Sequence, residues 1–245
     1  MEPRELIQHI EETASLPSGS GERFAGYAVI GLPFRSGHVL ALRRFPASSL
    51  GSGYTSVWHR DPVGNWTFYS TTAPEQSCSR YFVSQVEENV HAQIRIEWGG
   101  SDKFRVIADC SRPLNWEVTL TQTVASRLMN AAARLVPDSW WQKPFMLRVM
   151  GFTARFALGT GKMNLAGRTP NGQEFIANPQ QVWLVKSSRA VVNGVEVGPT
   201  GPLPEQARLN EFLIPQRGIF AVARSFLQTT DRVIHVSRAR RGVAA

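Results

Sequence analysis

Apolar and polar residues alternate along much of this chain, and the alternation is cleanest over residues 92–109. Ile94, Ile96 and Trp98 fall on one face of an extended segment, with Arg95 and Glu97 on the other. Residues 103–109 repeat the pattern after the short turn at 99–102. A period of two residues is typical of a half-buried strand, so the pattern predicts a β-hairpin here.

A second hairpin is predicted from residues 53–60 and 66–71, because Pro62 and Gly64 suit the turn between them. Similar short runs, separated by Pro, Gly and Asn, indicate further strands at 27–30, 38–45, 115–121, 162–167, 173–177, 181–187, 190–197 and 219–227. The segment 198–218 contains four prolines and is expected to be a long, stiff connection. We therefore expect a mainly β protein, either an antiparallel barrel or a two-sheet sandwich.

The period changes to a helical one between residues 123 and 158. Residues 124–136 form an expected helix with Leu128, Ala132 and Leu135 toward the core, and Pro137 ends it. Apolar residues then recur at about helical spacing from Phe145 to Phe156. A helix pair over a barrel mouth or a sheet flank explains this insertion.

The predicted organisation is an N-terminal helix and linker at 1–21, one β-rich domain at 22–230 with the helical insertion 123–158, and a basic tail at 231–245. A chain of 245 residues suits one large β domain. We find no signal-peptide pattern and no apolar run long enough to span a membrane, so we expect a cytoplasmic protein.

The net charge of +8 has its excess in the insertion and the tail. Basic residues there outnumber acidic ones, which suits an anionic membrane or an acidic partner better than nucleic acid, since the basic helices also carry large apolar side chains.

Motifs for phosphate, dinucleotide or metal binding are absent from the sequence, so no cofactor and no metal are expected. His59 and Glu117 are the candidates for acid–base chemistry, but alternation places each on the face opposite a neighbouring tryptophan. Cys78 is a further candidate nucleophile if Arg80 lowers the pKa of its thiol.

The hairpin at 56–66, SVWHRDPVGNW, and the strand at 114–120, LNWEVTL, resemble the lipocalin-like family that includes AttH-type proteins and carotenoid hydratases. The resemblance covers residues 26–121 and 161–227. It implies β-barrel halves that enclose hydrophobic molecules, and some relatives hydrate, isomerise or cyclise polyenes. The helical insertion and the short chain depart from the two-barrel members, and no catalytic residue can be transferred.

The leading hypothesis is a protein that binds a hydrophobic small molecule, such as a polyene, lipid or polyketide, in an aromatic-lined cavity, with isomerase, cyclase or hydratase activity as an enzymatic extension. The residues expected to bind the ligand are Tyr54, Trp58, Trp66, Trp116, Trp141, Phe145 and Trp183. The alternative is a peripheral protein that binds an anionic membrane or an acidic partner through its basic helices. We also expect the insertion to act either as a lid, with Trp140, Trp141, Phe145 and Met146 nearest the ligand, or as an anchor on the sheet.

Overall fold

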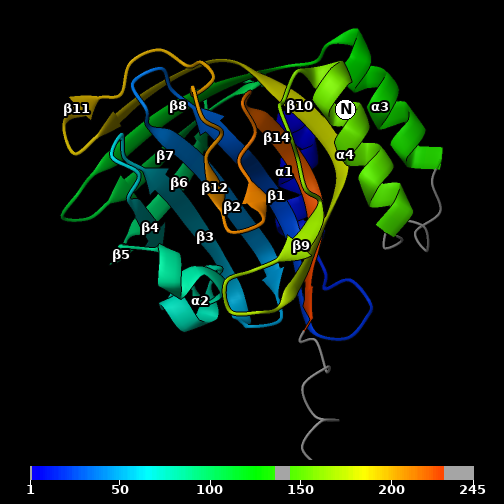
Figure 1. The fold of residues 1–245 in the computed structure, drawn as a ribbon, viewed down its shortest axis with the longest axis horizontal. Coiled ribbons are helices and arrows are strands. Elements are labelled where there is room, and N and C mark those ends of the chain that lie inside the picture. Colours follow the sequence, from blue (N-terminus) through cyan, green and yellow to red (C-terminus); the bar gives the residue numbers. More distant parts are fainter. Residues whose placement is uncertain (1, 136–143, 229–245) are drawn as a thin grey trace, which may run out of the picture.

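One large, strongly bent β-sheet dominates the computed structural model, which describes residues 2–135 and 144–228 (Figure 1). Its main path runs in the order β5-β4-β3-β2-β1-β14-β10-β8-β7-β6. The strands on this path are β1 (Glu22–Pro33), β2 (Val39–Ser48), β3 (Gly51–Arg60), β4 (Trp66–Ser70), β5 (Glu88–His91), β6 (Gln93–Trp98), β7 (Lys103–Asp109), β8 (Leu114–Thr121), β10 (Glu174–Val192) and β14 (Ile219–Gln228). The prediction of a mainly β protein is confirmed.

The sheet resembles a sandwich, and the described strands do not close into a barrel. Its path ends at β5 and β6, which follow each other in the chain. Neighbours on the path are antiparallel, except that β4 and β5 pair in parallel, with Thr67 opposite Glu88. Both predicted hairpins are present, and Trp98 lies opposite Phe104 as the alternation requires.

Each face of the sheet carries its own core, because successive side chains of a strand point to opposite sides. In β2, Leu40 and Leu42 belong to the inner core, which lies between the two bent halves of the sheet. Ala41 and Phe45 belong to the outer core. Arg43 lies between them in the sequence and points to the outer side as well.

The second half of the chain differs from the prediction in two places. The runs at 173–177, 181–187 and 190–197 were expected to be separate strands, but the first two and part of the third form the single 19-residue strand β10. Register shifts at Pro179/Gln181 and Val185/Ser187 bend β10, so one strand serves both halves of the sheet. Two short strands flank it, namely β9 (Ala166–Arg168) and β11 (Val195–Glu196).

The segment 198–218, which we call the arm, was expected to be a plain connection but contains two short strands. It contains the hairpin of β12 (Arg208–Leu209) and β13 (Phe212–Leu213), which lies over the outer face of the sheet (Figure 1). Leu203, Leu209 and Ile214 are buried in the outer core and hold this arm against the sheet. Their burial explains why a proline-rich segment is ordered here.

Helices cover parts of both faces. Helix α1 (Pro3–Thr13), predicted at 2–14, inserts Ile7 into the inner core. Helices α3 (Val124–Leu135) and α4 (Pro144–Leu158) lie beside each other next to β10 (Figure 1). A short element beyond β4 comprises the 3-10 turns at Pro74–Gln76 and Val83–Gln85 and helix α2 (Ser79–Phe82).

The face of α3 that packs on the sheet was predicted incorrectly. Leu128 was expected to face the core and is 66% exposed, whereas Asn130 is buried. The Asn130 amide donates from Nδ2 to the carbonyl oxygen of Val182, and its Oδ1 accepts the backbone N–H of Val182, both at 2.9 Å. These two hydrogen bonds satisfy the backbone N–H and carbonyl groups of Val182 in β10. They also turn the Asn130 face of α3 toward the sheet, in place of the apolar face that contains Leu128.

No helix in the described ranges is long and apolar enough to cross a membrane. The basic tail expected at 231–245 and the predicted site residue Trp141 lie outside the described residues, as does Trp140.

Candidate functional site

The outer face of the central strands is hollow because its side chains are small. Where β14 points Phe220 and Val222 into the inner core, it places Ala221, Ala223 and Ser225 on the outer side. Ala28 of β1 and Ala177 of β10 continue this floor. Small side chains leave space between the sheet and the arm that carries β12 and β13.

Two adjoining lobes, each of about 70 Å³, occupy this space. We call them together the Arg43 cavity. Both lobes are lined by Arg43, Phe45, Ala177, Phe212 and Ser225. The first lobe continues toward α4 and the second toward α2.

Aromatic rings form most of the wall of the second lobe. Its aromatic lining consists of Phe24, Phe45, Trp58, Tyr81, Phe82, Phe175, Phe212 and Phe226. Trp58 stacks on Phe68, with ring centroids 4.4 Å apart, and meets Phe82 edge-on at 5.3 Å. These contacts fix the rings, so the cavity keeps its shape without a ligand.

Arg43 is the one charged side chain among the described residues that line the two lobes, and it is 6% exposed. Its Nη1 donates to the carbonyl oxygens of Val29 at 2.7 Å and Leu42 at 2.9 Å, and Nη2 donates to that of Ile30 at 3.0 Å. The guanidinium carbon lies 4.4 Å from the centroid of Trp58. Burial lowers the pKa of Arg43 to about 10, so the side chain is still charged at neutral pH.

A thiol and a phenol lie close to this cation. The hydroxyl of Tyr54 and Sγ of Cys78 are 2.9 Å apart, and both residues are buried. Burial raises the pKa of the Cys78 thiol, although Tyr54 and the charge of Arg43 oppose the shift. Arg80 does not supply the activating charge expected from the sequence, because it faces Glu22 and the carbonyl oxygen of Glu75.

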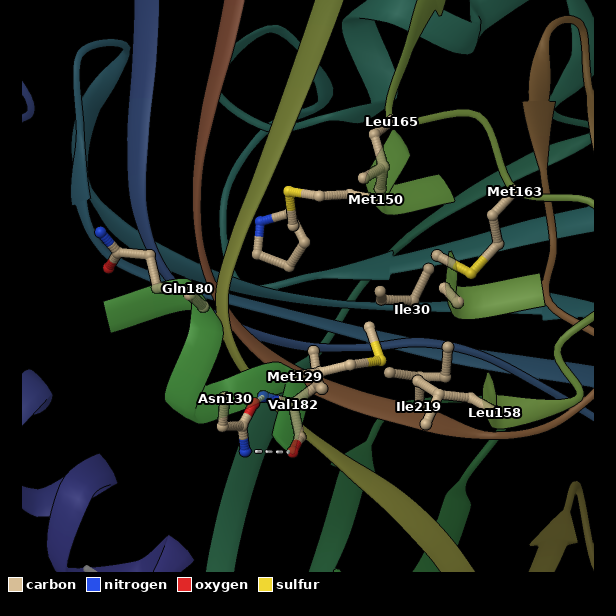
Figure 2. Close-up of a pocket in the computed structure, with 13 residues that line it drawn as sticks. Ile30, Met129, Asn130, Met150, Leu158, Met163, Leu165, Gln180, Val182 and Ile219 are labelled. Carbon is tan, nitrogen blue, oxygen red and sulfur yellow. Dashed lines mark hydrogen bonds between the residues drawn. The ribbon is translucent and has the colours of Figure 1, made fainter. Parts of the chain in front are cut away.

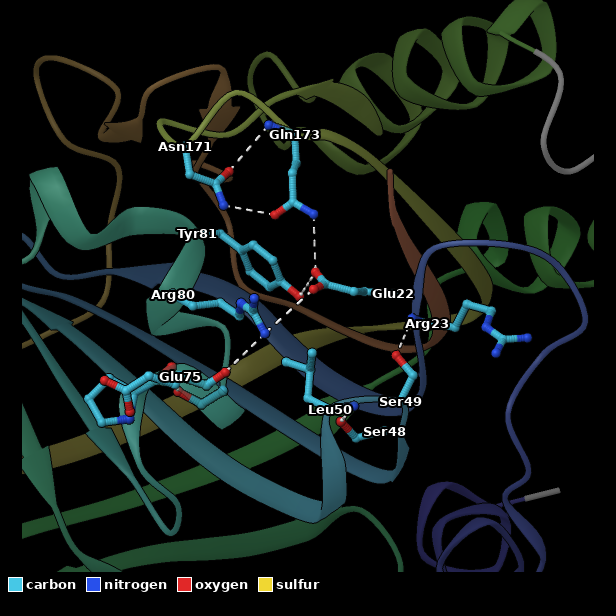
Figure 3. Close-up of polar contacts among 12 residues, drawn as sticks. Glu22, Arg23, Ser48, Ser49, Leu50, Glu75, Arg80, Tyr81, Asn171 and Gln173 are labelled. Carbon is cyan, nitrogen blue, oxygen red and sulfur yellow. Dashed lines mark hydrogen bonds and ion pairs between the residues drawn. The ribbon is translucent and has the colours of Figure 1, made fainter. Parts of the chain in front are cut away.

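A polar cluster adjoins the second lobe through Tyr81, which is part of the lining of that lobe (Figure 3). Tyr81 donates its hydroxyl to Oε2 of Glu22 at 2.5 Å, and Gln173 donates Nε2 to the same oxygen at 3.2 Å. Nη1 of Arg80 lies 3.5 Å from the other oxygen of Glu22. Burial and then Glu22 raise the pKa of Tyr81. The carboxylate of Glu22 is therefore fully engaged at the edge of the cavity.

A third hollow, of about 40 Å³, lies between α3, α4 and the sheet (Figure 2). Met129, Met150 and Met163 line it, and Met163 also lines the first lobe of the Arg43 cavity. Methionine side chains adapt their shape easily. The apolar tract therefore extends from α4 to Tyr81.

A wider cleft, of about 490 Å³, lies between α1 and the inner side of the sheet. Its arginine is paired: Arg44 binds both carboxylate oxygens of Glu11, and the hydroxyl of Tyr27 donates to Glu11 at 2.8 Å. Burial, and then the charge of Glu11, raises the pKa of Tyr27. Because the cleft is broad and partly polar and its arginine is already paired with Glu11, we take the Arg43 cavity as the candidate site.

The residues predicted to bind ligand do not form one site. Trp58 lines the second lobe, and Tyr54 lies behind it in the outer core with Trp66. Trp116 and Trp183 lie in the inner core on the other side of the sheet. The tryptophans were grouped because they all lie in strands. Alternation along each strand places some of them on the outer face of the sheet and others on the inner face.

Within the helical insertion, Phe145 is 74% exposed. Met146 lines none of the four hollows described above.

Neither Glu117 nor His59 lines the Arg43 cavity. Glu117 is bound by Arg105 and Lys103, and these hydrogen bonds lower the pKa of its carboxyl group. His59 lies on the inner side, with Nε2 at 2.9 Å from Nδ1 of His38 and the two rings stacked. Burial, and then the neighbouring His38, lowers the pKa of His59 to about 4.

Arg43 was missed as a site residue in the sequence, although a signal was present. It stands beside Arg44 in a mostly apolar strand, and Ala41 and Phe45, two residues away on either side, face the outer core. An arginine at such a position has to be buried, and a buried charge marks a polar contact of some kind.

Comparison with known proteins gives no family. No protein-family model matches the chain, and no curated protein matches it either. Among solved structures, an acetoacetate decarboxylase from Legionella pneumophila shares 10% identity at a TM-score of 0.36, over 90% of this chain and 92% of that one. A second acetoacetate decarboxylase structure shares 10% identity at a TM-score of 0.42, over 93% and 95%. These scores are too low to carry an argument about fold or activity, and the resemblance to the lipocalin-like AttH and carotenoid hydratase family stays a prediction.

Proposed function

We propose that this protein binds a hydrophobic small molecule in the Arg43 cavity. The observation that carries the proposal is the contrast between the two sides of β14, with bulky side chains inward and a floor of alanine and serine outward. Core packing alone favours filled space, since each void forfeits contacts between its lining atoms. A row of small residues facing fixed aromatic walls is the arrangement expected of a ligand pocket.

A reaction is not part of the proposal. An isomerase, cyclase or hydratase of this kind needs an acid or a base in contact with the substrate. Tyr54 and Cys78 are the ionisable side chains nearest to Arg43, and burial raises the pKa of both. At neutral pH they keep their protons, so they can donate hydrogen bonds or a proton but cannot act as bases, and neither is shown in contact with a substrate.

A larger side chain on the floor of the cavity tests this proposal. Ala223 lines the first lobe, and Ala223→Leu should occupy much of the space there. We expect ligand-observed NMR with a panel of small aromatic and aliphatic fragments to show binding to the natural protein and loss of binding to the variant. Native mass spectrometry after mild purification would identify a co-purifying ligand.

Ala132→Leu is the matched control, because it adds the same atoms on the exposed surface of α3. Equal fragment binding by Ala223→Leu and Ala132→Leu would show that the ligand does not enter the cavity.

A second candidate function is peripheral binding to an anionic membrane through α3 and α4. Six apolar side chains on these helices are exposed, namely Val124, Leu128, Phe145, Val149, Phe152 and Phe156. The rings of Phe152 and Phe156 lie 4.6 Å apart, and the guanidinium of Arg155 lies 5.3 Å from the ring of Phe156. Neither helix contains an acidic residue. An exposed apolar face with cations and no anions suits a negatively charged lipid surface.

Vesicle sedimentation tests this second function. Binding should rise with the fraction of phosphatidylglycerol in phosphatidylcholine vesicles and fall as salt increases, because salt screens surface charge. Replacing Phe152 and Phe156 with serine should abolish it. Val63→Ser removes an apolar side chain that is exposed outside these helices and serves as the control. Unchanged sedimentation of the double variant would exclude these helices as the membrane contact.

A further inference from the structure

We propose that the ligand of the Arg43 cavity is a small organic acid whose carboxylate is bound by Arg43. This inference rests on the proposed function and adds the chemical class of the ligand. It follows from three properties of Arg43: its unused hydrogen-bond donors, its lack of an acidic partner, and the size of the space beside it.

The guanidinium group has donors to spare. It carries five N–H groups, and the three bonds to the carbonyl oxygens of Val29, Leu42 and Ile30 use three of them. The N–H of Nε and one N–H of Nη2 have no acceptor within the described ranges. Nε and Nη2 are neighbouring nitrogens of one planar group, which is the geometry that holds a carboxylate through two parallel hydrogen bonds.

No carboxylate of the described chain neutralises Arg43. Glu22, at the edge of the second lobe, is held by Tyr81, Arg80 and Gln173. Glu11 pairs with Arg44 on the other side of the sheet. The groups that act electrostatically on Arg43 are Cys78 and Tyr54, which are neutral at physiological pH because burial raises the pKa of each.

A buried charge without a counter-ion is costly, and the three carbonyl groups and the stacked ring of Trp58 offset this cost in part. A carboxylate in the cavity would supply the missing opposite charge. Arg43 thus satisfies backbone carbonyl groups at the register shift between β1 and β2, and it also places a cation on the wall of the cavity.

The space limits the size of the acid. Each lobe holds about 70 Å³, and the two meet at Arg43. An engineered apolar cavity of about 150 Å³ in another protein binds benzene. The two lobes therefore suit an acid with a single ring or a short chain, such as phenylacetate or hexanoate. Apolar and aromatic lining on both sides of Arg43 leaves little place for a more heavily charged group.

The test compares an acid with its neutral isostere in the natural protein. Phenylacetate and phenylacetamide have the same shape and differ in charge. Charge-assisted hydrogen bonds should make phenylacetate bind roughly tenfold to hundredfold more tightly, as measured by isothermal titration calorimetry or by NMR titration. This comparison needs no variant, so it does not depend on whether a changed protein folds.

Two variants then locate the effect. Arg43→Met should remove the preference for the acid, whereas Arg44→Met should keep it, because Arg44 is the adjacent residue and points to the opposite side. Circular dichroism and thermal melting verify that each variant is folded.

The outcomes separate the two proposals. Equal binding of acid and amide would overturn the role of Arg43 and leave the apolar cavity in place as a ligand site. A preference for the acid that survives in folded Arg43→Met would also overturn that role. If neither phenylacetate, hexanoate nor their amides bind, the proposed function fails and this inference fails with it.

Discussion

The pair of histidines on the inner side of the sheet makes the stability of the protein depend on pH. His59 is 8% exposed, and its Nε2 lies 2.9 Å from Nδ1 of His38. One ring donates a proton to the other only while the accepting nitrogen is free. Protonating both rings would place two positive charges in contact in a buried site, which is unfavourable.

The pKa shift gives the size and direction of the effect. The pKa of His59 falls from 6.5 to about 4 on folding. Between these values the unfolded chain binds a proton and the folded protein does not, so acid favours unfolding. The contribution is fully present above pH 6.5 and is lost as the pH falls toward 4. At about 1.4 kcal/mol per pKa unit, the loss from pH 7 to pH 4.5 is about 2 to 3 kcal/mol.

Urea denaturation of the natural protein and of His59→Gln, at pH 7 and at pH 4.5, measures this contribution. The free energy of unfolding of the natural protein should fall by about 2 to 3 kcal/mol more than that of His59→Gln over this interval. His9→Gln, which removes an exposed histidine of α1, is the control. If the natural protein and His59→Gln lose equal stability between the two pH values, the histidine pair does not have this role.

Two further predictions concern residues that the site and the sheet depend on. The affinity for phenylacetate should stay level from pH 6 to pH 9, because Arg43 keeps its charge over this range although burial lowers its pKa to about 10. Titration calorimetry checks this, and an affinity that falls between pH 6 and pH 9 would contradict the assignment. Asn130→Ala should cost about 2 to 3 kcal/mol of stability, because it leaves the buried backbone N–H and carbonyl of Val182 without partners. Hydrogen exchange at the Val182 amide should become faster, while an exchange rate equal to that of the natural protein would refute the role of Asn130.

The positions of the strands could be predicted from the sequence because apolar and polar residues alternate where one face of a strand is buried and the other is exposed. The hairpin of β6 and β7 shows this well, since the predicted facing of Trp98 and Phe104 is the observed register. Asn193 and Gly194 are a further signal that was not used: both adopt positive φ, which is the requirement of the tight turn between β10 and β11.

The cavity was harder to predict, because it depends on which side of each strand is covered. Alternation separates Trp58 from His59, but it does not tell whether the side of Trp58 or the side of Trp116 faces a hollow. That difference comes from the small residues of β14 and β1, which are far apart in sequence and adjacent in the sheet. The orientation of α3 was predicted incorrectly for a related reason. Two hydrogen bonds between Asn130 and β10 turn the face of Asn130 toward the sheet, and this leaves Leu128 exposed.

The position of β14 has a consequence for the order in which the fold assembles during synthesis. It lies between β1 and β10, and it pairs Glu22 at the start of β1 with Leu227 near its own end. Until the ribosome has released β14, β1 and β10 each keep one edge without a partner, and most of β1 consists of residues that are buried in the folded protein. Unpaired edges of this kind recruit other chains, and pairing over so long a stretch of sequence is slow. The nascent chain is therefore most exposed to aggregation just before its central strand emerges, which is the stage at which a chaperone would help it most.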